Sequence, residues 1–368
     1  MIFVDGAPFD FNSSSSEKIL FALMEHPSLV SASKAFKAIP ERKFSLAEES
    51  GTERPEKSKW VYLFQREYAT VDPALVDFVG TDEATTCVGF AIRDRKNGMV
   101  SVAHMDSPNV VDKGLNQMLS TFVHQSFDDD LDVHVIGAFE DSSSKHDSSS
   151  SSSESDVRLN GYSLPLCTKI IKSLRKRTEK FHLQTLFVLA RNTWRDSEEN
   201  AHPIFSGFVV ETSTGSVIPA RFDNTSRCPD EMIRRIRASA AYEDRKWDGK
   251  LLETYDTQTD TFKIAPCRWS TENQERIARF LRAQSDSYIL LNCSTSPFAE
   301  APDFVQNERK KWDYLIENPD WRKAFPMEQP HVFERTGDGG WTSASAQINT
   351  SSFFYKMSSM RERSCHLC

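Results

Sequence analysis

Apolar and polar positions follow two kinds of pattern along most of the chain. Short apolar runs rich in β-branched and aromatic side chains predict strands, and apolar positions at helical spacing predict amphipathic helices. The predicted strands cover residues 60–65, 86–93, 99–104, 131–139, 185–190, 205–211, 216–222 and 288–291. The predicted helices cover residues 110–124, 164–174, 231–241, 272–283 and 303–317. Hairpin strands interspersed with helices are typical of an α+β, or mixed α/β, protein.

One predicted hairpin carries the most informative chemistry. Lys96-Asn97-Gly98 separates the strands 86–93 and 99–104, and Asn-Gly between apolar runs is a strong hairpin signal. In an antiparallel pair, the start of one strand lies beside the end of the other. We therefore expect Cys87, at the start of the first strand, to lie near His104, at the end of the second.

A serine tract interrupts this pattern. Ten of the fourteen residues from Ser142 to Ser155 are serine, and such a composition cannot bury apolar surface. We predict a disordered insertion over about 141–157 within one large domain, 1–335. The polar segment 336–368 is predicted to be a flexible tail.

Composition limits the possible functions. The net charge of −8 disfavours a general nucleic-acid binder, and no apolar run reaches the roughly 18 residues of a membrane-spanning helix. The start of the chain lacks the pattern of a secretory signal peptide, so we expect none. Seven scattered cysteines predict reduced thiols and a cytoplasmic location. The basic run 172–180 leaves a nuclear location open. No cysteine spacing indicates zinc, and we expect neither a metal nor a cofactor.

A cysteine beside a histidine is the arrangement that thiol-based nucleophilic catalysis requires. An adjacent imidazolium lowers the pKa of a thiol, and the thiolate then attacks an acyl or amide carbon. The structural alternative is that Cys87 is a small buried residue and His104 an ordinary strand end.

Four segments resemble the eukaryotic protein N-terminal asparagine amidohydrolases. They are GTDEATTC at 80–87, AHMD at 103–106, VHVIGAFED at 133–141 and LNCSTSPFAEAPDFV at 291–305. The resemblance implies that Cys87 is the nucleophile and that proteins or peptides with a free N-terminal Asn are the substrates. It also implies that Asn is deamidated to Asp with release of ammonia, in the N-degron pathway of protein turnover.

The arrangement also resembles bacterial glutamine deamidases. Their fold is a layered α-β-β sandwich, in which a hydroxyl or carbonyl group orients the histidine. The resemblance implies Thr81 as the orienting residue beside Cys87 and His104, with Thr85 and Thr86 as alternatives.

A free N-terminal Asn carries an α-ammonium group, and a carboxylate near the nucleophile is its natural partner. The nearest carboxylates by sequence are Asp82, Glu83 and Asp106. A second polar block is expected to line the same pocket, with a helix-capping role as its alternative. It comprises Ser294, Thr295, Ser296 and Glu300.

Two other classes of function stay open. A different thiol hydrolase, such as a Gln side-chain deamidase or a cysteine protease, would share Cys87 and His104. A non-catalytic scaffold would use the serine tract as a phosphorylatable interaction segment. We expect a monomer that binds neither nucleic acid nor membranes.

Overall fold

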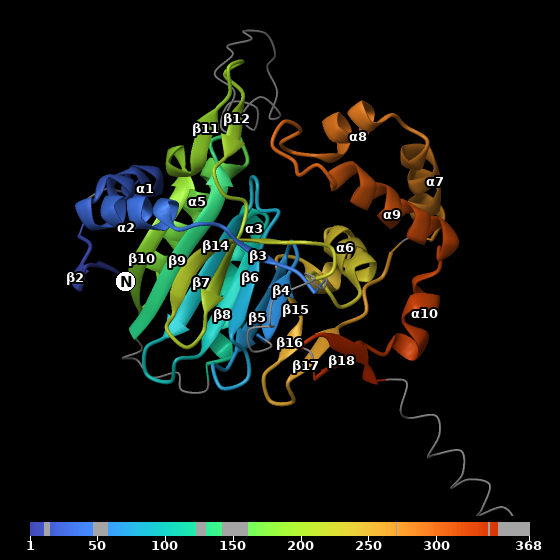
Figure 1. Ribbon diagram of the computed structural model, residues 1–368, viewed down its shortest axis with the longest axis horizontal. Helices are drawn as coiled ribbons and strands as arrows, with labels where there is room; N and C mark the ends of the chain where they lie inside the picture. The colour runs from blue at the N-terminus through green and yellow to red at the C-terminus, as the bar shows by residue number, and fades with distance from the viewer. Residues whose placement is uncertain are drawn as a thin grey trace, which may run out of the picture.

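The computed structural model describes residues 1–10, 15–46, 58–122, 130–141, 161–269, 271–337 and 339–344. Most of these residues form three layers, in which helices cover one sheet and that sheet packs on a second one (Figure 1). This arrangement confirms the predicted α+β class. The resemblance to bacterial deamidases stays a prediction. Among the described helices, none has both the length and the apolar character needed to cross a membrane.

The first sheet has eight strands in the order β15-β5-β8-β7-β9-β10-β1-β2. Its strands are β1 (Ile2–Val4), β2 (Ala7–Pro8), β5 (Glu67–Val71), β7 (Val88–Asp94), β8 (Val100–Met105), β9 (Asp130–Phe139), β10 (Lys180–Leu189) and β15 (Leu252–Glu253). The helices α1 (Ser16–Glu25), α3 (Pro108–Ser120) and α5 (Ser163–Arg175) pack on one face, through residues such as Leu20, Leu115 and Ile170. Helix α2 (Pro27–Ala38) lies against β10.

The second sheet has five strands in the order β3-β14-β13-β6-β4. Its strands are β3 (Arg42–Phe44), β4 (Trp60–Leu63), β6 (Phe78–Thr81), β13 (Phe208–Glu211) and β14 (Ser216–Phe222). Ala91 and Val102 of the first sheet meet Val79 and Phe208 of the second in one buried cluster. Buried apolar area of this kind is the main favourable contribution to folding, so the two sheets hold each other in place.

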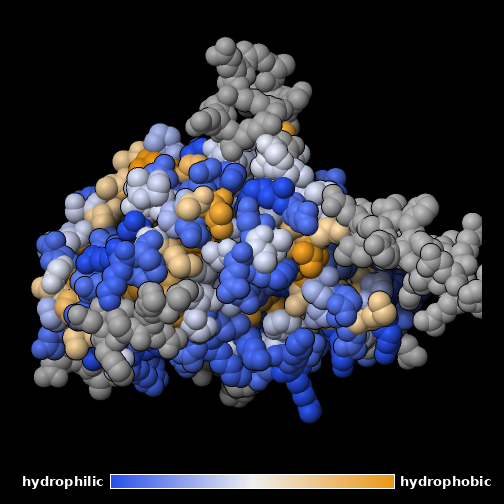
Figure 2. Space-filling view, turned by 90° about the horizontal axis from the view of Figure 1, so that it is seen from below, coloured by the Kyte–Doolittle hydropathy of each residue, from blue (hydrophilic) through white to orange (hydrophobic). Residues whose placement is uncertain are grey.

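The remaining elements surround one side of the second sheet, at the right of Figure 1. They are α6 (Glu231–Ala240), α7 (Thr271–Arg282), α8 (Asp286–Cys293), α9 (Phe304–Glu317), α10 (Trp321–Ala324), and a small sheet of β16 (Tyr255–Asp256), β17 (Thr261–Ile264), β18 (His331–Arg335) and β19 (Trp341–Ser343). A separate hairpin joins β11 (Thr193–Arg195) to β12 (Ala201–Pro203). On the face seen in Figure 2, hydrophobic side chains are scattered among hydrophilic ones, as is usual for a protein surface.

Most predicted elements are present within a few residues of the expected ends. The segment 288–291 is an exception, because it lies in helix α8 and not in a strand. A short apolar run does not distinguish the two, and the Ser285 hydroxyl caps the helix by accepting from the amide of Tyr288. The start of the predicted tail also contains structure, because Trp341–Ser343 pairs with β18 as β19. The serine tract 142–155 and residues 345–368 lie outside the described residues.

Candidate active site

Cys87 and His104 lie at the same end of the β7–β8 hairpin. Cys87 directly precedes β7, and His104 of β8 pairs with Gly89. Side chains two residues apart on a strand lie on the same face of the sheet, and so do two residues paired directly opposite each other. Cys87, Gly89 and His104 therefore lie on one face of the first sheet. A Cβ atom on Gly89 would meet the ring of Phe208 at 2.2 Å, which identifies this face as the one that packs on the second sheet. The candidate pair therefore lies between the two sheets.

Thr81 of β6 reaches His104 from the opposing sheet. Its Oγ1 lies 2.7 Å from Nδ1 of His104 and donates to the carbonyl oxygen of Leu63, also at 2.7 Å. A threonine hydroxyl has one hydrogen, so towards His104 it acts as an acceptor and Nδ1 carries the imidazole proton. Nε2 of His104 is then the basic nitrogen, and it is buried without a hydrogen-bond partner among the described residues.

The surroundings keep both members of the pair uncharged. Burial lowers the pKa of His104 to about 4, and the carboxylates of Glu83 and Glu67 oppose this only in part. Burial raises the pKa of the Cys87 thiol well above its usual value, and Asp106 and Glu300 act in the same direction. Both shifts favour the neutral forms, a thiol at Cys87 and an uncharged imidazole at His104. The expectation that an imidazolium lowers the pKa of the thiol stays a prediction.

The turn before Cys87 is fixed against the end of β9. The amide of Ala138 donates to the carbonyl of Cys87 at 2.7 Å, and the amide of Phe139 donates to that of Thr85 at 3.1 Å. Gly137 has a φ of +105°, and a Cβ atom there would lie 3.0 Å from the Cys87 carbonyl oxygen. Glycine suits this position because it tolerates the backbone angle and the close approach.

The second polar block lies against this turn, although it is more than 200 positions away in the sequence. The Ser296 hydroxyl donates to Oγ1 of Thr85 at 2.8 Å, and the hydroxyls of Thr86 and Thr295 lie 3.0 Å apart. The amide of Ser296 donates to the Ser294 hydroxyl at 2.8 Å. The structure therefore brings together the two segments that the sequence analysis expected to share a pocket.

Glu300 is the last residue of this polar block and contacts two of its serines. The Ser294 hydroxyl donates to Oε1 of Glu300, and the Ser296 hydroxyl lies 3.5 Å from the same oxygen. Burial raises the pKa of Glu300 to about 7. Within the described part of the chain, no lysine, arginine or histidine forms an ion pair with this carboxylate.

The carboxylates of Asp82 and Glu83, shortly before Cys87 in the sequence, already have partners in the structure. Asp82 is buried and accepts from Tyr62, the amide of Phe222 and Arg227, and burial raises its pKa to about 6. Each carboxylate oxygen of Glu83 lies 3.0 Å from a nitrogen of Arg235.

Glu83 also forms an ion pair with Arg227 at 2.8 Å. Burial acts to raise the pKa of Glu83, but the charges of Arg235 and Arg227 outweigh it and hold that pKa below its usual value. Glu83 therefore has two cationic partners before any substrate arrives.

Asp106 faces the Cys87 position one step beyond the end of the β7–β8 pairing. Tyr242 donates to its Oδ2 at 2.6 Å, and a guanidinium nitrogen of Arg66 lies 4.0 Å from the same oxygen. Oδ1 of Asp106 is buried and has no partner among the described residues. Burial raises the pKa of this carboxyl. Arg66 and Tyr242 were not predicted as site residues, since no local pattern links them to the hairpin.

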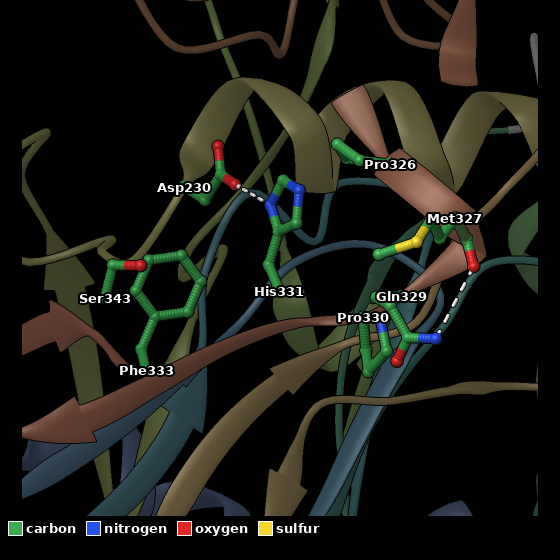
Figure 3. Close-up of a pocket in the computed structure, with 8 residues that line it drawn as sticks. All are labelled: Asp230, Pro326, Met327, Gln329, Pro330, His331, Phe333 and Ser343. Atoms are coloured by element: carbon green, nitrogen blue, oxygen red, sulfur yellow. Dashed lines mark hydrogen bonds and ion pairs between the residues drawn. The ribbon is translucent and has the colours of Figure 1, made fainter. Parts of the chain in front are cut away.

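A cavity of about 460 Å³ lies elsewhere, beside β18 and the start of α6 (Figure 3). Asp230, Met327, His331 and Phe333 are among its lining residues. None of the predicted site residues lines it. The Cys87 site is therefore the better candidate for catalysis, because it brings together a thiol, an imidazole and a hydroxyl in contact with that imidazole.

Comparison with known proteins identifies the family. The family model for protein N-terminal asparagine amidohydrolase matches residues 50–343. The chain belongs to the protein N-terminal asparagine amidohydrolase family. A relative of that name from Arabidopsis thaliana is 52% identical over 349 residues, covering 93% of this chain and 99% of the relative.

Animal members of the family are more distant but still match most of the chain. The Mus musculus relative of the same name is 29% identical over 78% of this chain and 84% of its own length. The Homo sapiens relative is 28% identical over the same shares. The resemblance seen in the sequence segments is thereby confirmed at the level of the family.

Proposed function

We propose that this protein hydrolyses the side-chain carboxamide of an N-terminal Asn to Asp and releases ammonia. Membership of the family supports this proposal, since the relatives carry that activity in their names. The observation that supports the mechanism most is the Thr81–His104 contact beside Cys87. It leaves Nε2 of the imidazole without a partner among the described residues, near the end of β8 and opposite the start of β7, which Cys87 precedes.

In the first step, Nε2 of His104 takes the proton of the Cys87 thiol as Sγ attacks the carboxamide carbon. The carbonyl π electrons move to oxygen and form a tetrahedral oxyanion. When the oxyanion collapses, the C–N bond breaks and the imidazolium gives its proton to the leaving nitrogen, so ammonia departs and a thioester remains. Thr81 keeps the imidazole in the tautomer that this cycle requires.

In the second step, His104 takes a proton from water as the water oxygen attacks the thioester carbon. The C–S bond breaks, the thiolate recovers the proton from the imidazolium, and an N-terminal Asp is released. Backbone N–H groups beside Cys87 stabilise the oxyanion in both steps, and removing one such donor typically costs about 10²–10³ in rate. The amides of Thr86 and Cys87 are the candidates, since they belong to the fixed turn.

Two alternative functions stay open, one that uses Cys87 and His104 and one that does not. A Gln side-chain deamidase or a cysteine protease would keep Cys87 and His104 and differ in the pocket. A single methylene changes binding by only about 1–3 kcal/mol, so pocket depth decides between Asn and Gln. A scaffold protein would need neither residue.

The wider role is what the family resemblance implies. An N-terminal Asp in place of Asn changes the signal that the N-degron pathway reads, so we place the protein at that step of protein turnover, in the cytoplasm or nucleus. We propose that it acts as a monomer on protein and peptide substrates, without a nucleic acid, a membrane or a cofactor.

The test is ammonia release from short peptides that differ only at the first residue. Wild type should release ammonia from a free N-terminal Asn, and should not do so from Gln, acetyl-Asn or Asp. Cys87→Ala should release none while remaining folded. Release from Gln would favour the alternative deamidase. No release from any peptide by folded wild type would favour the scaffold.

A further inference from the structure

A carboxylate with no cationic partner among the described residues lies at the candidate site. Glu300 is partly buried. The Ser294 hydroxyl donates to its Oε1, and the Ser296 hydroxyl, which donates to Thr85, lies 3.5 Å from the same oxygen. Both hydroxyls contact Oε1, which leaves Oε2 available to a ligand. A buried carboxylate without a cation is costly, so a site of this kind favours binding a positive charge.

The position of Glu300 is tied to the nucleophile through two short links. Ser296, which contacts Glu300, also donates to Thr85, and Thr86 meets Thr295. Thr85 and Thr86 directly precede Cys87. The negative charge of Glu300 also acts to raise the pKa of the Cys87 thiol, so the two groups are close enough to interact electrostatically.

The other nearby carboxylates are less suited to a new cation. Asp82 and Glu83 already pair with Arg227, and Glu83 also pairs with Arg235. Asp106 lies near Arg66 and accepts from Tyr242, so part of its charge is already compensated. Its buried and unpartnered Oδ1 is an independent sign that a ligand with hydrogen-bond donors belongs in the same pocket.

We propose that Glu300, held by Ser294 and Ser296, binds the α-ammonium group of the substrate and thereby restricts the reaction to free N-termini. This inference rests on the proposed function. Oε2 of Glu300 accepts the ammonium hydrogens, while the carboxamide group extends towards Cys87. Oδ1 of Asp106 accepts from an N–H of the carboxamide.

The same arrangement links substrate recognition to activation of the nucleophile. The negative charge of Glu300 contributes to the raised pKa of the Cys87 thiol, and a bound ammonium offsets that charge. A substrate with a free N-terminus therefore eases the proton transfer from Cys87 to His104. A blocked N-terminus brings no such charge.

The experiment compares two peptides that differ in one group. One begins with Asn, and the other begins with a succinamoyl group, which is Asn without its α-amino group. Ammonia release by wild type, Glu300→Gln and Asp106→Asn is measured to give kcat/KM for each peptide. Glu317→Gln, an exposed position at the end of α9, is the matched control. Circular dichroism and thermal unfolding establish that each variant is folded.

We expect Glu300→Gln to lower kcat/KM for the Asn peptide by roughly 10- to 100-fold, the range for a charge-assisted hydrogen bond. It should leave the succinamoyl peptide unchanged or slightly faster, so that the preference for a free amino group is lost. Asp106→Asn should slow both peptides together and keep that preference. The control should match wild type.

Two results would overturn the inference while leaving the proposed function intact. One is an equal loss for both peptides in Glu300→Gln, and the other is a loss of the preference in Asp106→Asn instead. A folded wild type that is inactive on the Asn peptide would refute the proposed function itself.

Discussion

The hydroxyl of Thr81 lies 2.7 Å from Nδ1 of His104, and the two residues belong to different sheets. The contact joins β6 to β8 at the end of the hairpin where Cys87 precedes β7. The packing of one sheet on the other therefore sets the orientation of the imidazole. A substitution that alters this packing would therefore change the orientation of the His104 imidazole as well as the stability of the fold.

Thr81→Val should impair catalysis more than binding. Valine has the same shape but no hydroxyl, so the imidazole loses the acceptor that keeps the proton on Nδ1. We expect kcat to fall roughly 10- to 100-fold, part of the 10²–10⁴ that general acid–base catalysis contributes, with KM little changed. Thr81→Ser, which keeps the hydroxyl, should recover most of the loss. Equal activity of the valine and serine variants in steady-state kinetics would contradict the orienting role.

The thiol of Cys87 should react slowly with alkylating agents near neutral pH. Burial and the charges of Asp106 and Glu300 raise its pKa, and burial keeps His104 neutral, so little thiolate forms without substrate. The rate of carboxamidomethylation of Cys87, followed by peptide mass mapping, should rise continuously from pH 6 to 9. A plateau across pH 5 to 8 would instead indicate a preformed thiolate–imidazolium pair.

Glu67→Gln should destabilise the fold strongly. The side chains of Glu67 and Arg234 are fully buried and 2.7 Å apart, so the substitution leaves the guanidinium without its counter-charge. Breaking a buried ion pair in this way costs about 3–5 kcal/mol. Urea unfolding measures the loss, and Glu317→Gln, at an exposed position, should change the free energy of unfolding by less than about 0.5 kcal/mol. A comparably small change in Glu67→Gln would show that other groups compensate.

The His331–Asp230 pair should make stability depend on pH. Nδ1 of His331 lies 2.7 Å from Asp230 and Nε2 lies 2.6 Å from the Ala324 carbonyl, so the imidazolium has an acceptor for each proton. The hydrogen bond to Asp230 raises the pKa of His331. A raised pKa stabilises the folded state below the unfolded value of about 6.5, and this contribution is lost as the pH rises through the folded value.

Asp230→Asn tests this dependence. Asparagine tolerates the φ of 51° at this position but carries no charge. The variant should be less stable than wild type by about 1 kcal/mol at pH 5.5, and the difference should shrink at pH 9. Asp313→Asn, which affects an exposed ion pair with Arg282, serves as the control. A difference between Asp230→Asn and wild type that does not vary with pH would refute the role of His331.

Local sequence patterns predict those parts of the site that are formed by residues close together in the sequence. Asn97-Gly98 specifies the hairpin, and the hairpin alone places Cys87 and His104 at one end. The prediction of a strand at 288–291 was wrong because a short apolar run is compatible with a strand or a helix. Here the N-cap at Ser285 favours the helix. Local signals thus suffice where a turn or a cap has a specific sequence.

Contacts across the fold could not be derived in this way. Arg66 reaches Asp106 from the turn between β4 and β5, and Tyr242 reaches it from the segment after α6. Arg227, just before α6, and Arg235, within it, engage Glu83. The sequence therefore indicates which carboxylates lie near Cys87 along the chain. It does not show which of them already have cationic partners, and that distinction favours Glu300 over Asp82 and Glu83.

The central claim is that Cys87 forms a thioester with the substrate. Mass spectrometry of wild type, quenched with acid during turnover of an Asn peptide, tests it most directly. We predict a covalent adduct on the fragment that contains Cys87, with the mass of the peptide minus ammonia, and no adduct or ammonia release with Cys87→Ala. Undiminished ammonia release by Cys87→Ala, or an adduct at another residue, would contradict the account.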